Sequence, residues 1–369
     1  MRASLLKGQF AAAGAVFRER HGAEVVARVA ERAAEYAAVR DAVGLTDFSF
    51  LHKFRVPAEP GLDFLDALLA GNVPKLRFGR VLHTFLAGND GLLRGDCYVA
   101  NNDEEFIFLC ESIAPDAEVR GSLQAAGATE AGAEDLTDNH ALLSVDGFRA
   151  WDVVKEIFGP DVLGLPFLSV ENYSFNGAPV RLFRAGKTSE FGYLLLVPVA
   201  MAPALFAACQ SAVTQLGGRL CGVDVHDDLR LEGRFFNIHA EGRRVRDPLV
   251  LGLQWMIDFQ KESFAGSAAI KRRRTEGLRH KIIGLAAEDG CTTLQDGARI
   301  YHEGRAVADV VASCFSYILG QPLGLAVFPV ALAYAGLAFR LGAPDGPVVR
   351  SISMPPIMPK SLTVKLDEL

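Results

Sequence analysis

The chain has 369 residues, of which 50% are hydrophobic and 22% are charged. This length suits two or three domains, and the apolar content excludes disorder as the main state. The 38 basic and 44 acidic residues give a formal net charge of −6, whereas a nucleic-acid-binding protein normally carries a basic excess that replaces phosphate counterions. We therefore expect a folded protein with no nucleic-acid partner.

The cysteines and the apolar stretches indicate the cellular compartment in which we expect the protein. The six cysteines are scattered and include no Cys-x-x-Cys pair, which indicates reduced thiols in a cytoplasmic protein with neither disulfides nor a metal site. The first 22 residues run from a short apolar patch into charged residues, which favours a helix over a secretion leader. The apolar run Leu323–Phe339 is too short for a membrane helix and contains Pro329. We expect two buried strands joined at this proline, and no membrane contact.

In chain order, the residues from Glu24 to Val43 predict one amphipathic helix, because apolar residues recur at helical spacing with charges between them. A short helix follows at 64–73, ended by Gly71. Apolar runs separated by turn residues then predict successive strands, and the Ala-, Gly- and Glu-rich stretch 121–134 predicts a helix or loop. The strands are Val81–Phe85, Leu92–Val99 and Glu105–Leu109.

A second block of strands and helices follows. Its predicted strands are Ala141–Asp146, Val180–Arg184 and Tyr193–Val197, and its helices are Arg149–Phe158 and Ala204–Leu216. Beyond the basic run Lys271–Arg274 the chain consists of short strands and turns. We therefore place a domain boundary near residue 275 and expect the basic run to be the solvated face of a linker.

Common catalytic signatures are missing from the sequence. It has no Gly-rich phosphate-binding loop, no His-Glu-x-x-His metal motif and no Gly-x-Ser-x-Gly nucleophile. The group Asn237, His239 and Glu241 has two interpretations, either the lining of a pocket or polar residues of a loop before Pro248. These patterns alone predict an α+β protein with a β-rich C-terminal part.

Longer segments carry a further signal. The most diagnostic is RAGKTSEFGY at 184–193, and a second segment is DLRLEG at 228–233. The others are Tyr36–Ser49, Pro248–Gly266, and the C-terminal stretch Gly297–Leu325 with Met354–Pro356. Taken in their order along the chain, the five segments resemble the aminomethyltransferase (glycine-cleavage T-protein) family, whose members have a threonine-glycine-glutamate-x-glycine segment followed by an arginine-x-glutamate segment.

The resemblance implies an α+β fold of two ferredoxin-like α+β subdomains plus a C-terminal β-barrel around a central folate channel. Residues 1–274 would form the folate-binding part, with subdomains at roughly 45–135 and 136–274 and the N-terminal helix, and residues 275–369 the barrel. The activity implied is transfer of an aminomethyl or methyl group from a small-molecule donor to tetrahydrofolate, the cosubstrate. A carrier protein as a further partner stays open, and a monomer is the default expectation.

The matched segments also imply residues that bind folate. Glu190 corresponds to a carboxylate that accepts parallel N–H donors of the pterin ring; a surface glutamate at a hairpin is the alternative. Thr188 and Tyr193 would shape the same wall. Arg230 would meet the anionic tail of folate or, alternatively, pair with Glu232.

Two residues are candidates for proton transfer, which contributes roughly 100- to 10,000-fold in such reactions. The family's adjacent aspartates fall on Arg94 and Gly95 when no gap is allowed, and one inserted residue places Asp96 there instead. A tyrosine common in the preceding strand is replaced by His83, and a glutamate usual further along by Val250. We therefore expect a divergent member in which Asp96 or His83 is catalytic. The alternatives are a turn-capping or exposed aspartate and a half-buried strand histidine.

Two other functions stay open at this point. One is a folate-binding protein without turnover, although the iron–sulfur-assembly relatives of the family carry a lysine-glycine-cysteine-tyrosine signature where this chain has QKESFAG at 260–266. The other is a scaffold that kept the fold and lost the ligand. The intact segment from Thr188 to Tyr193 argues against the scaffold, because a lost pocket need not retain a buried carboxylate.

Overall fold

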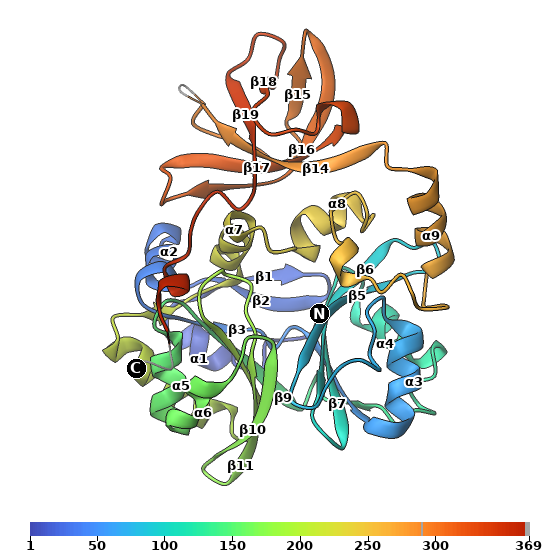
Figure 1. Cartoon of the computed structure of the whole chain (residues 1–369). Coiled ribbons are helices and arrows are strands. Elements are labelled where there is room, and N and C mark those ends of the chain that lie inside the picture. The colour runs from blue at the N-terminus through green and yellow to red at the C-terminus, as the bar shows by residue number, and fades with distance from the viewer. Residues whose placement is uncertain (289–290, 366–369) are drawn as a thin grey trace. The chain divides into compact units, whose positions relative to one another are not determined.

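The computed structural model describes residues 1–288 and 291–365 (Figure 1). The chain forms two compact units. The first consists of residues 1–86 and 94–226 with the C-terminal segment that begins at Pro359, and the second of residues 87–93 and 227–358. The predicted boundary near residue 275 therefore lies inside the second unit, at the end of helix α9 (Ser267–Glu276).

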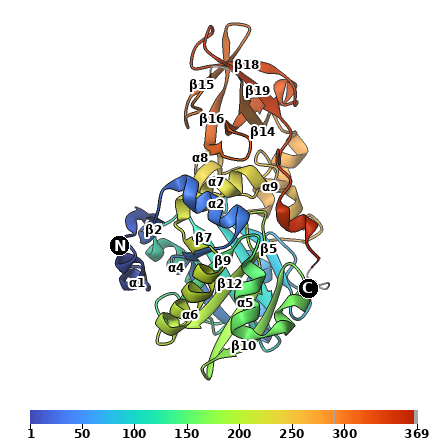
Figure 2. The ribbon, with the colours of Figure 1, turned by 90° about the vertical axis from the view of Figure 1, so that its left-hand side faces the viewer.

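A six-stranded sheet forms one half of the first unit. Helices α1 (Lys7–Ala12), α5 (Ala150–Phe158) and α6 (Ala202–Gln215) supply apolar side chains such as Phe10, Val153 and Phe206 to the core on one of its faces, and α5 and α6 are visible together in Figure 2. All neighbouring strands are antiparallel except the last pair. Across the sheet they are β10 (Ser169–Phe175), β11 (Ala178–Arg184), β12 (Gly192–Pro198), β9 (His140–Asp146), β3 (Gly44–Asp47) and β13 (Arg219–Leu220).

A five-stranded sheet forms the other half of the first unit. Helices α3 (Ala58–Leu68) and α4 (Asp116–Ala125) pack on it through a second core that includes Leu65, Leu123 and Phe108. Its strands, in order, are β5 (Val81–Ala87), β6 (Leu93–Asn101), β7 (Glu105–Ser112), β4 (His52–Pro57) and β8 (Glu134–Asp135).

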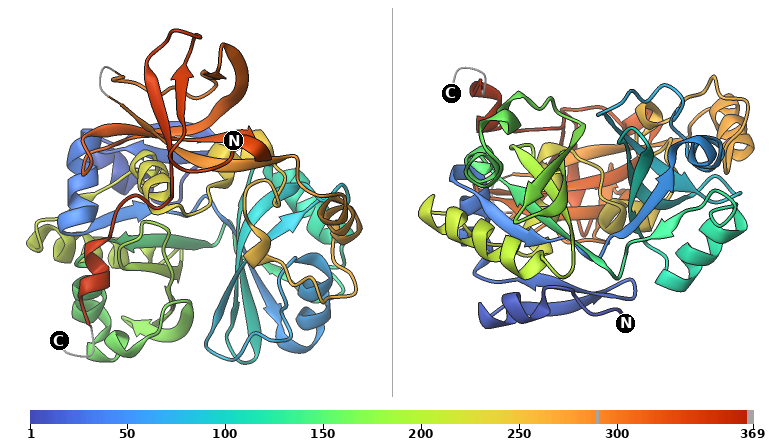
Figure 3. Two further views of the ribbon diagram at one scale, coloured as in Figure 1. Left: turned by 45° about the horizontal axis from the view of Figure 1, so that its top comes forward. Right: turned by 90° about the horizontal axis from the view of Figure 1, so that it is seen from below.

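A third core fills the space between the two sheets, and the helices lie on the outer faces (Figure 3, right). Because strand side chains alternate between faces, Tyr98 and Leu109 point into this layer while Val99 and Phe108 point to the helices. The same alternation brings Asp96, two residues before Tyr98, and Glu111, two residues after Leu109, to the inter-sheet face. These two acidic side chains therefore lie on the same inter-sheet face as the apolar side chains of the third core.

A closed six-stranded barrel dominates the second unit. Its core includes Leu285, Ile300, Phe328 and Phe339. Around the barrel the strands are β14 (His280–Ala287), β17 (Gln321–Pro329), β16 (Arg305–Ser316), β15 (Arg299–His302), β18 (Ala338–Leu341) and β19 (Val348–Ile352). The predicted α+β fold with a C-terminal β-barrel is confirmed, as are the predicted strands at 81–109 and the elements between 141 and 216, with shifted ends.

The predicted helix at 24–43 is wrong over its first part. Residues Ala23–Arg28 form strand β2, which pairs with β1 (Val16–Arg20) around a turn at His21 and Gly22. Only Arg32–Asp41 is helical, as α2. Adjacent β-branched valines and burial of successive side chains favour the strand, which a helical spacing of the same residues does not reveal.

One expectation about the C-terminal third needs correction. The apolar run 323–339 contains only one long strand, because β17 ends at Pro329 and β18 begins at Ala338, with the exposed Tyr334 between them. The basic run Lys271–Arg274, expected as the solvated face of a linker, is part of helix α9, where Arg273 pairs with Asp247 at 3.0 Å and Arg274 stacks 3.9 Å over a phenylalanine ring. No helix among the described residues is long and apolar enough to span a membrane.

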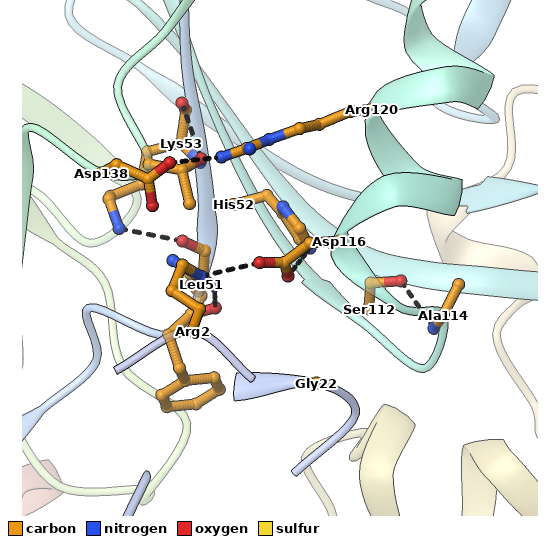
Figure 4. A network of polar contacts seen from close by, with 12 residues as sticks. Arg2, Gly22, Leu51, His52, Lys53, Ser112, Ala114, Asp116, Arg120 and Asp138 are labelled. Atoms are coloured by element: carbon orange, nitrogen blue, oxygen red, sulfur yellow. Dashed lines mark hydrogen bonds and ion pairs between the residues drawn. The ribbon is translucent and has the colours of Figure 1, made fainter. Parts of the chain in front are cut away.

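A partly buried network of polar contacts anchors the N-terminus to the bend after β3 (Figure 4). Arg2 donates to the carbonyl of Ser49 at 3.2 Å and to the Asp116 carboxylate at 2.9 Å. Lys53, with no exposed surface, donates to the carbonyls of Ser49 and Leu51 at 2.7 and 2.9 Å. Two cations therefore satisfy the carbonyls of this bend, and burial lowers the pKa of Lys53 to about 7.

Lys53 makes stability depend on pH in a predictable direction. The unfolded lysine has a pKa of about 10.4, so between pH 7 and that value the unfolded state binds more protons and the free energy of unfolding rises with pH. Relative to Lys53→Met, the wild type should gain about 2 to 3 kcal/mol between pH 7 and pH 9. Urea unfolding of both proteins at pH 6, 7 and 9 measures this, and a constant difference would contradict the account.

Candidate functional site

The segment Arg184–Tyr193 forms a tight loop between β11 and β12. Its two ends meet at Gly186 and Gly192, where a Cβ placed on either residue would lie 2.8 or 2.7 Å from the other's Cα. No larger side chain fits this neck, which explains the glycine that ends the motif. The intervening residues 187–191 project from the neck, and their side chains reach partners on different elements.

The middle of the loop has an unusual backbone. Ser189 has a φ of 72°, in the left-handed region that costs a residue with a Cβ about 1–2 kcal/mol. The motif that the segment resembles has glycine at this position. The backbone at position 189 thus has a conformation typical of glycine, although the residue is serine.

Glu190 is buried and its two carboxylate oxygens have partners. Oε1 accepts from Arg40 of α2 at 3.0 Å, and Arg40 also donates to the carbonyl of Thr188 at 2.8 Å. Oε2 accepts from the backbone N–H and the hydroxyl of Ser361, at 3.0 and 2.5 Å. Ser361 belongs to the 3-10 turn Lys360–Thr363 of the C-terminal segment. The surface-glutamate alternative is therefore excluded, because the side chain is 1% exposed.

Lys187 lies at the other end of the loop and reaches the five-stranded sheet. Its Nζ donates to Asp96 Oδ2 at 2.5 Å and to Glu111 Oε1 at 3.0 Å. Asp96 and Glu111 are directly opposite each other on β6 and β7, and like charges in that position destabilise a sheet. The ammonium between them offsets this repulsion.

His83 completes the cluster. Its Nε2 lies 2.6 Å from Asp96 Oδ1, and since an ionised carboxylate only accepts, the imidazole carries a proton on Nε2. The ring of Tyr98 packs against two members of the cluster, with its centroid 4.7 Å from the centroid of the His83 ring and 4.9 Å from Lys187 Nζ. The alternatives of a turn-capping or exposed aspartate do not hold, because Asp96 is 1% exposed in the middle of a strand.

The charge state of the cluster follows from its contacts. Burial acts to raise the pKa of Asp96, but the ammonium of Lys187 and then His83 outweigh it, and the pKa is lowered. Burial lowers the pKa of His83 despite the neighbouring Asp96. At neutral pH, Asp96 is therefore an anion and His83 is neutral. The described residues contain no group of His, Cys, Asp and Glu side chains suited to hold a metal ion.

Thr188 and Tyr193 are both fully buried, in different surroundings. The Thr188 hydroxyl has no hydrogen-bond partner among the described residues, next to the carbonyl that Arg40 holds. Tyr193 belongs to the core between the six-stranded sheet and its helices, and burial raises its pKa to about 12. Tyr193 thus faces away from the inter-sheet layer to which its neighbour Leu194 belongs.

Arg230 lies in the second unit, on helix α7 (Val223–Gly233), and is 3% exposed. Residues two apart on a helix do not face each other, which disfavours its pairing with Glu232. The group Asn237, His239 and Glu241, also in this unit, is buried in a π-helical turn at Ile238–Gly242. There the Glu241 carboxylate accepts from the backbone of Asn237 at 3.1 Å, so this group is internal structure and not an exposed loop.

Four residues of the first unit that hold the candidate site together were not expected from the sequence. They are Arg40, Glu111, Lys187 and Ser361. Lys187 and Arg40 lie inside segments that resemble the family, but their partners come from distant parts of the chain. Only Glu111 had a local signal, a charge that follows the apolar strand EFIFLC.

The strained serine gives a stability prediction. Ser189→Gly removes the Cβ from a left-handed backbone and should raise the free energy of unfolding by about 1 kcal/mol, less the extra entropy of an unfolded glycine. Ser189→Ala removes the same hydroxyl but keeps the Cβ, and should bring no gain. Differential scanning calorimetry of the wild type and the two variants measures these changes in stability. An equal effect of both substitutions would show that the backbone at residue 189 is not strained.

Comparison with known proteins places this geometry in a family. The GCVT N-terminal domain model matches residues 6–261, and the glycine cleavage T-protein C-terminal barrel domain model matches residues 280–357. The aminomethyltransferase of Mycobacterium avium is 31% identical over 319 residues, covering 85% of each chain, and that of Mycobacterium tuberculosis is 30% identical over 321 residues with the same coverage.

A solved structure shows the same fold. Aminomethyltransferase T of the glycine cleavage system from Bartonella henselae matches with a TM-score of 0.83 over 97% of this chain and 98% of that one, at 19% identity. Together with the two family models, these relatives show that the chain belongs to the aminomethyltransferase (glycine-cleavage T-protein) family of one-carbon transferases.

Proposed function

We propose that this chain is a tetrahydrofolate-dependent one-carbon transferase that acts on a small aminomethyl or methyl donor, with Asp96 at its reaction centre. The observation that carries the proposal is a water-shielded aspartate anion held by His83 and Lys187. Membership of the family supports folate as the acceptor. The departures at Arg94 and Gly95 support a donor different from that of the glycine-cleavage enzymes.

The chemistry of the first unit fits a pterin. A pterin ring presents parallel N–H donors, and Glu190 Oε2 already accepts two donors, the N–H and O–H of Ser361. The buried Thr188 hydroxyl, without a partner among the described residues, offers a further hydrogen bond beside it. In this proposal the pterin donors replace Ser361 on Oε2 while Arg40 keeps the carboxylate in place. Tyr193 supports the wall from the core behind it.

Bound tetrahydrofolate supplies the nitrogen that accepts the one-carbon unit. Asp96, an anion in a water-excluded site, stabilises positive charge that develops there. His83 keeps its Nε2 proton on Asp96 Oδ1 and so orients the carboxylate. Since Asp96 is ionised and His83 neutral at pH 7, Asp96 acts as a proton acceptor and not as a proton donor. Arg230 remains our candidate for the anionic tail of folate.

Calorimetric titration with tetrahydrofolate tests the binding half of the proposal. We expect micromolar binding by the wild type and a loss of at least about tenfold in Glu190→Gln, which keeps the shape of the side chain but removes the charged acceptor. Ser361→Ala is the matched control: it removes the competing hydroxyl from the same oxygen and should bind at least as tightly. No heat at millimolar folate would contradict every folate-dependent function for this chain.

Turnover separates a transferase from a folate-binding protein. With methyl and aminomethyl donors supplied, Asp96→Asn should still bind tetrahydrofolate but lose about 100-fold or more of the transfer rate. The measurement is the appearance of methyl- or methylene-tetrahydrofolate by mass spectrometry. Binding without transfer from any donor would favour the non-catalytic folate-binding alternative.

A further inference from the structure

The loop at 187–191 places one cation where two carboxylates converge. Asp96 and Glu111 form a directly opposed pair on neighbouring strands, and both are at least 97% buried. Lys187 approaches them from the opposite sheet and donates to each, at 2.5 and 3.0 Å. No other role in the motif requires a lysine here, because the loop is already closed by its glycine neck and fixed by Glu190.

We propose that Lys187 is the positioning residue of the reaction centre: its ammonium, held between Asp96 and Glu111 over the ring of Tyr98, keeps Asp96 an anion and fixes which of its oxygens remains bound to His83. Lys187 donates to Oδ2 and His83 donates to Oδ1, so a hydrogen bond to each oxygen fixes the orientation of the carboxylate. The inference rests on the proposed function only where catalysis is concerned, because the charge and orientation of Asp96 are properties of the protein alone.

The direction of the effect follows from the surroundings. Within the first unit, the groups that face Asp96 are His83 from β5, Glu111 from β7 and Lys187 from the loop. Without the ammonium, burial and the opposed Glu111 both act to raise the pKa of Asp96. An opposite charge within about 4–6 Å typically lowers a carboxyl pKa by about 1–3 units, and its removal should raise the pKa of Asp96 by a similar amount.

The first test uses the wild type and requires no folate. Carbon-13 titration of labelled aspartate carboxyl groups, with Asp96 assigned through Asp96→Asn, should show Asp96 ionised from pH 8 down to pH 5. In Lys187→Met its titration should move up by about 1–3 pH units, and Lys187→Arg should restore it. Lys155→Met, which removes a lysine that also lies over an aromatic ring, should leave the Asp96 titration unchanged.

A second variant covers the case in which Lys187→Met does not fold. The double substitution Lys187→Met with Glu111→Gln removes the cation and the opposed anion together, and should still leave Asp96 with a raised pKa. A wild-type Asp96 that titrates above pH 5, or an unchanged Asp96 titration in Lys187→Met and in the double variant, would overturn the proposal. A fall in melting temperature alone would show a merely structural role and would equally overturn it.

Turnover then links the charge to catalysis. In an active preparation, the acid limb of the kcat/KM profile should move up with the Asp96 titration in Lys187→Met and return in Lys187→Arg. If the titration behaves as expected but no folate-dependent turnover is found, the proposed function fails and the positioning role stands. If turnover is found and its acid limb does not follow Asp96, the positioning role in catalysis is wrong.

Discussion

The ion pair between Lys187 and Asp96 joins the two sheets of the first unit at the place where their shared apolar layer becomes polar. Hydrophobic packing alone would leave Asp96 and Glu111 as opposed, buried anions, which is an unfavourable arrangement in a low-dielectric interior. The ammonium resolves it, but only because the β11–β12 loop carries the lysine across the layer. The position of this loop is therefore what the rest of the candidate site depends on.

Three features fix the position of the loop. The glycine neck at Gly186 and Gly192 brings its ends together with no room for side chains. The left-handed backbone at Ser189 turns the chain, and the buried Arg40–Glu190 pair fixes its far end to helix α2. The same carboxylate binds the C-terminal segment through Ser361. A short motif thus ties a helix, both sheets and the C-terminal segment into one arrangement, which accounts for its spacing better than ligand binding by Glu190 alone.

Much of the fold could be predicted from the sequence, because strands such as Ala141–Asp146 have clear apolar runs between turn residues. The hairpin at 16–28 could not be predicted, since the spacing of Val25 and Val29 fits the period of a helix as well as that of a strand. At the candidate site, the segments that resemble the family suggest Asp96, His83, Thr188 and Glu190. They do not indicate the partners Lys187, Glu111, Arg40 and Ser361, because pairing between residues 91 or 171 positions apart leaves no local pattern. Periodicity shows which face a residue occupies, but not which distant charge it meets.

The most direct measurement of the central claim is hydrogen–deuterium exchange by mass spectrometry, with and without tetrahydrofolate, on the full chain. We expect slower exchange with folate in strands β5 and β6 and in the loop 185–193, together with faster exchange at 359–365 as Ser361 leaves Glu190. Protection confined to the barrel, or no protection at a saturating folate concentration, would contradict a folate-dependent reaction centre at Asp96.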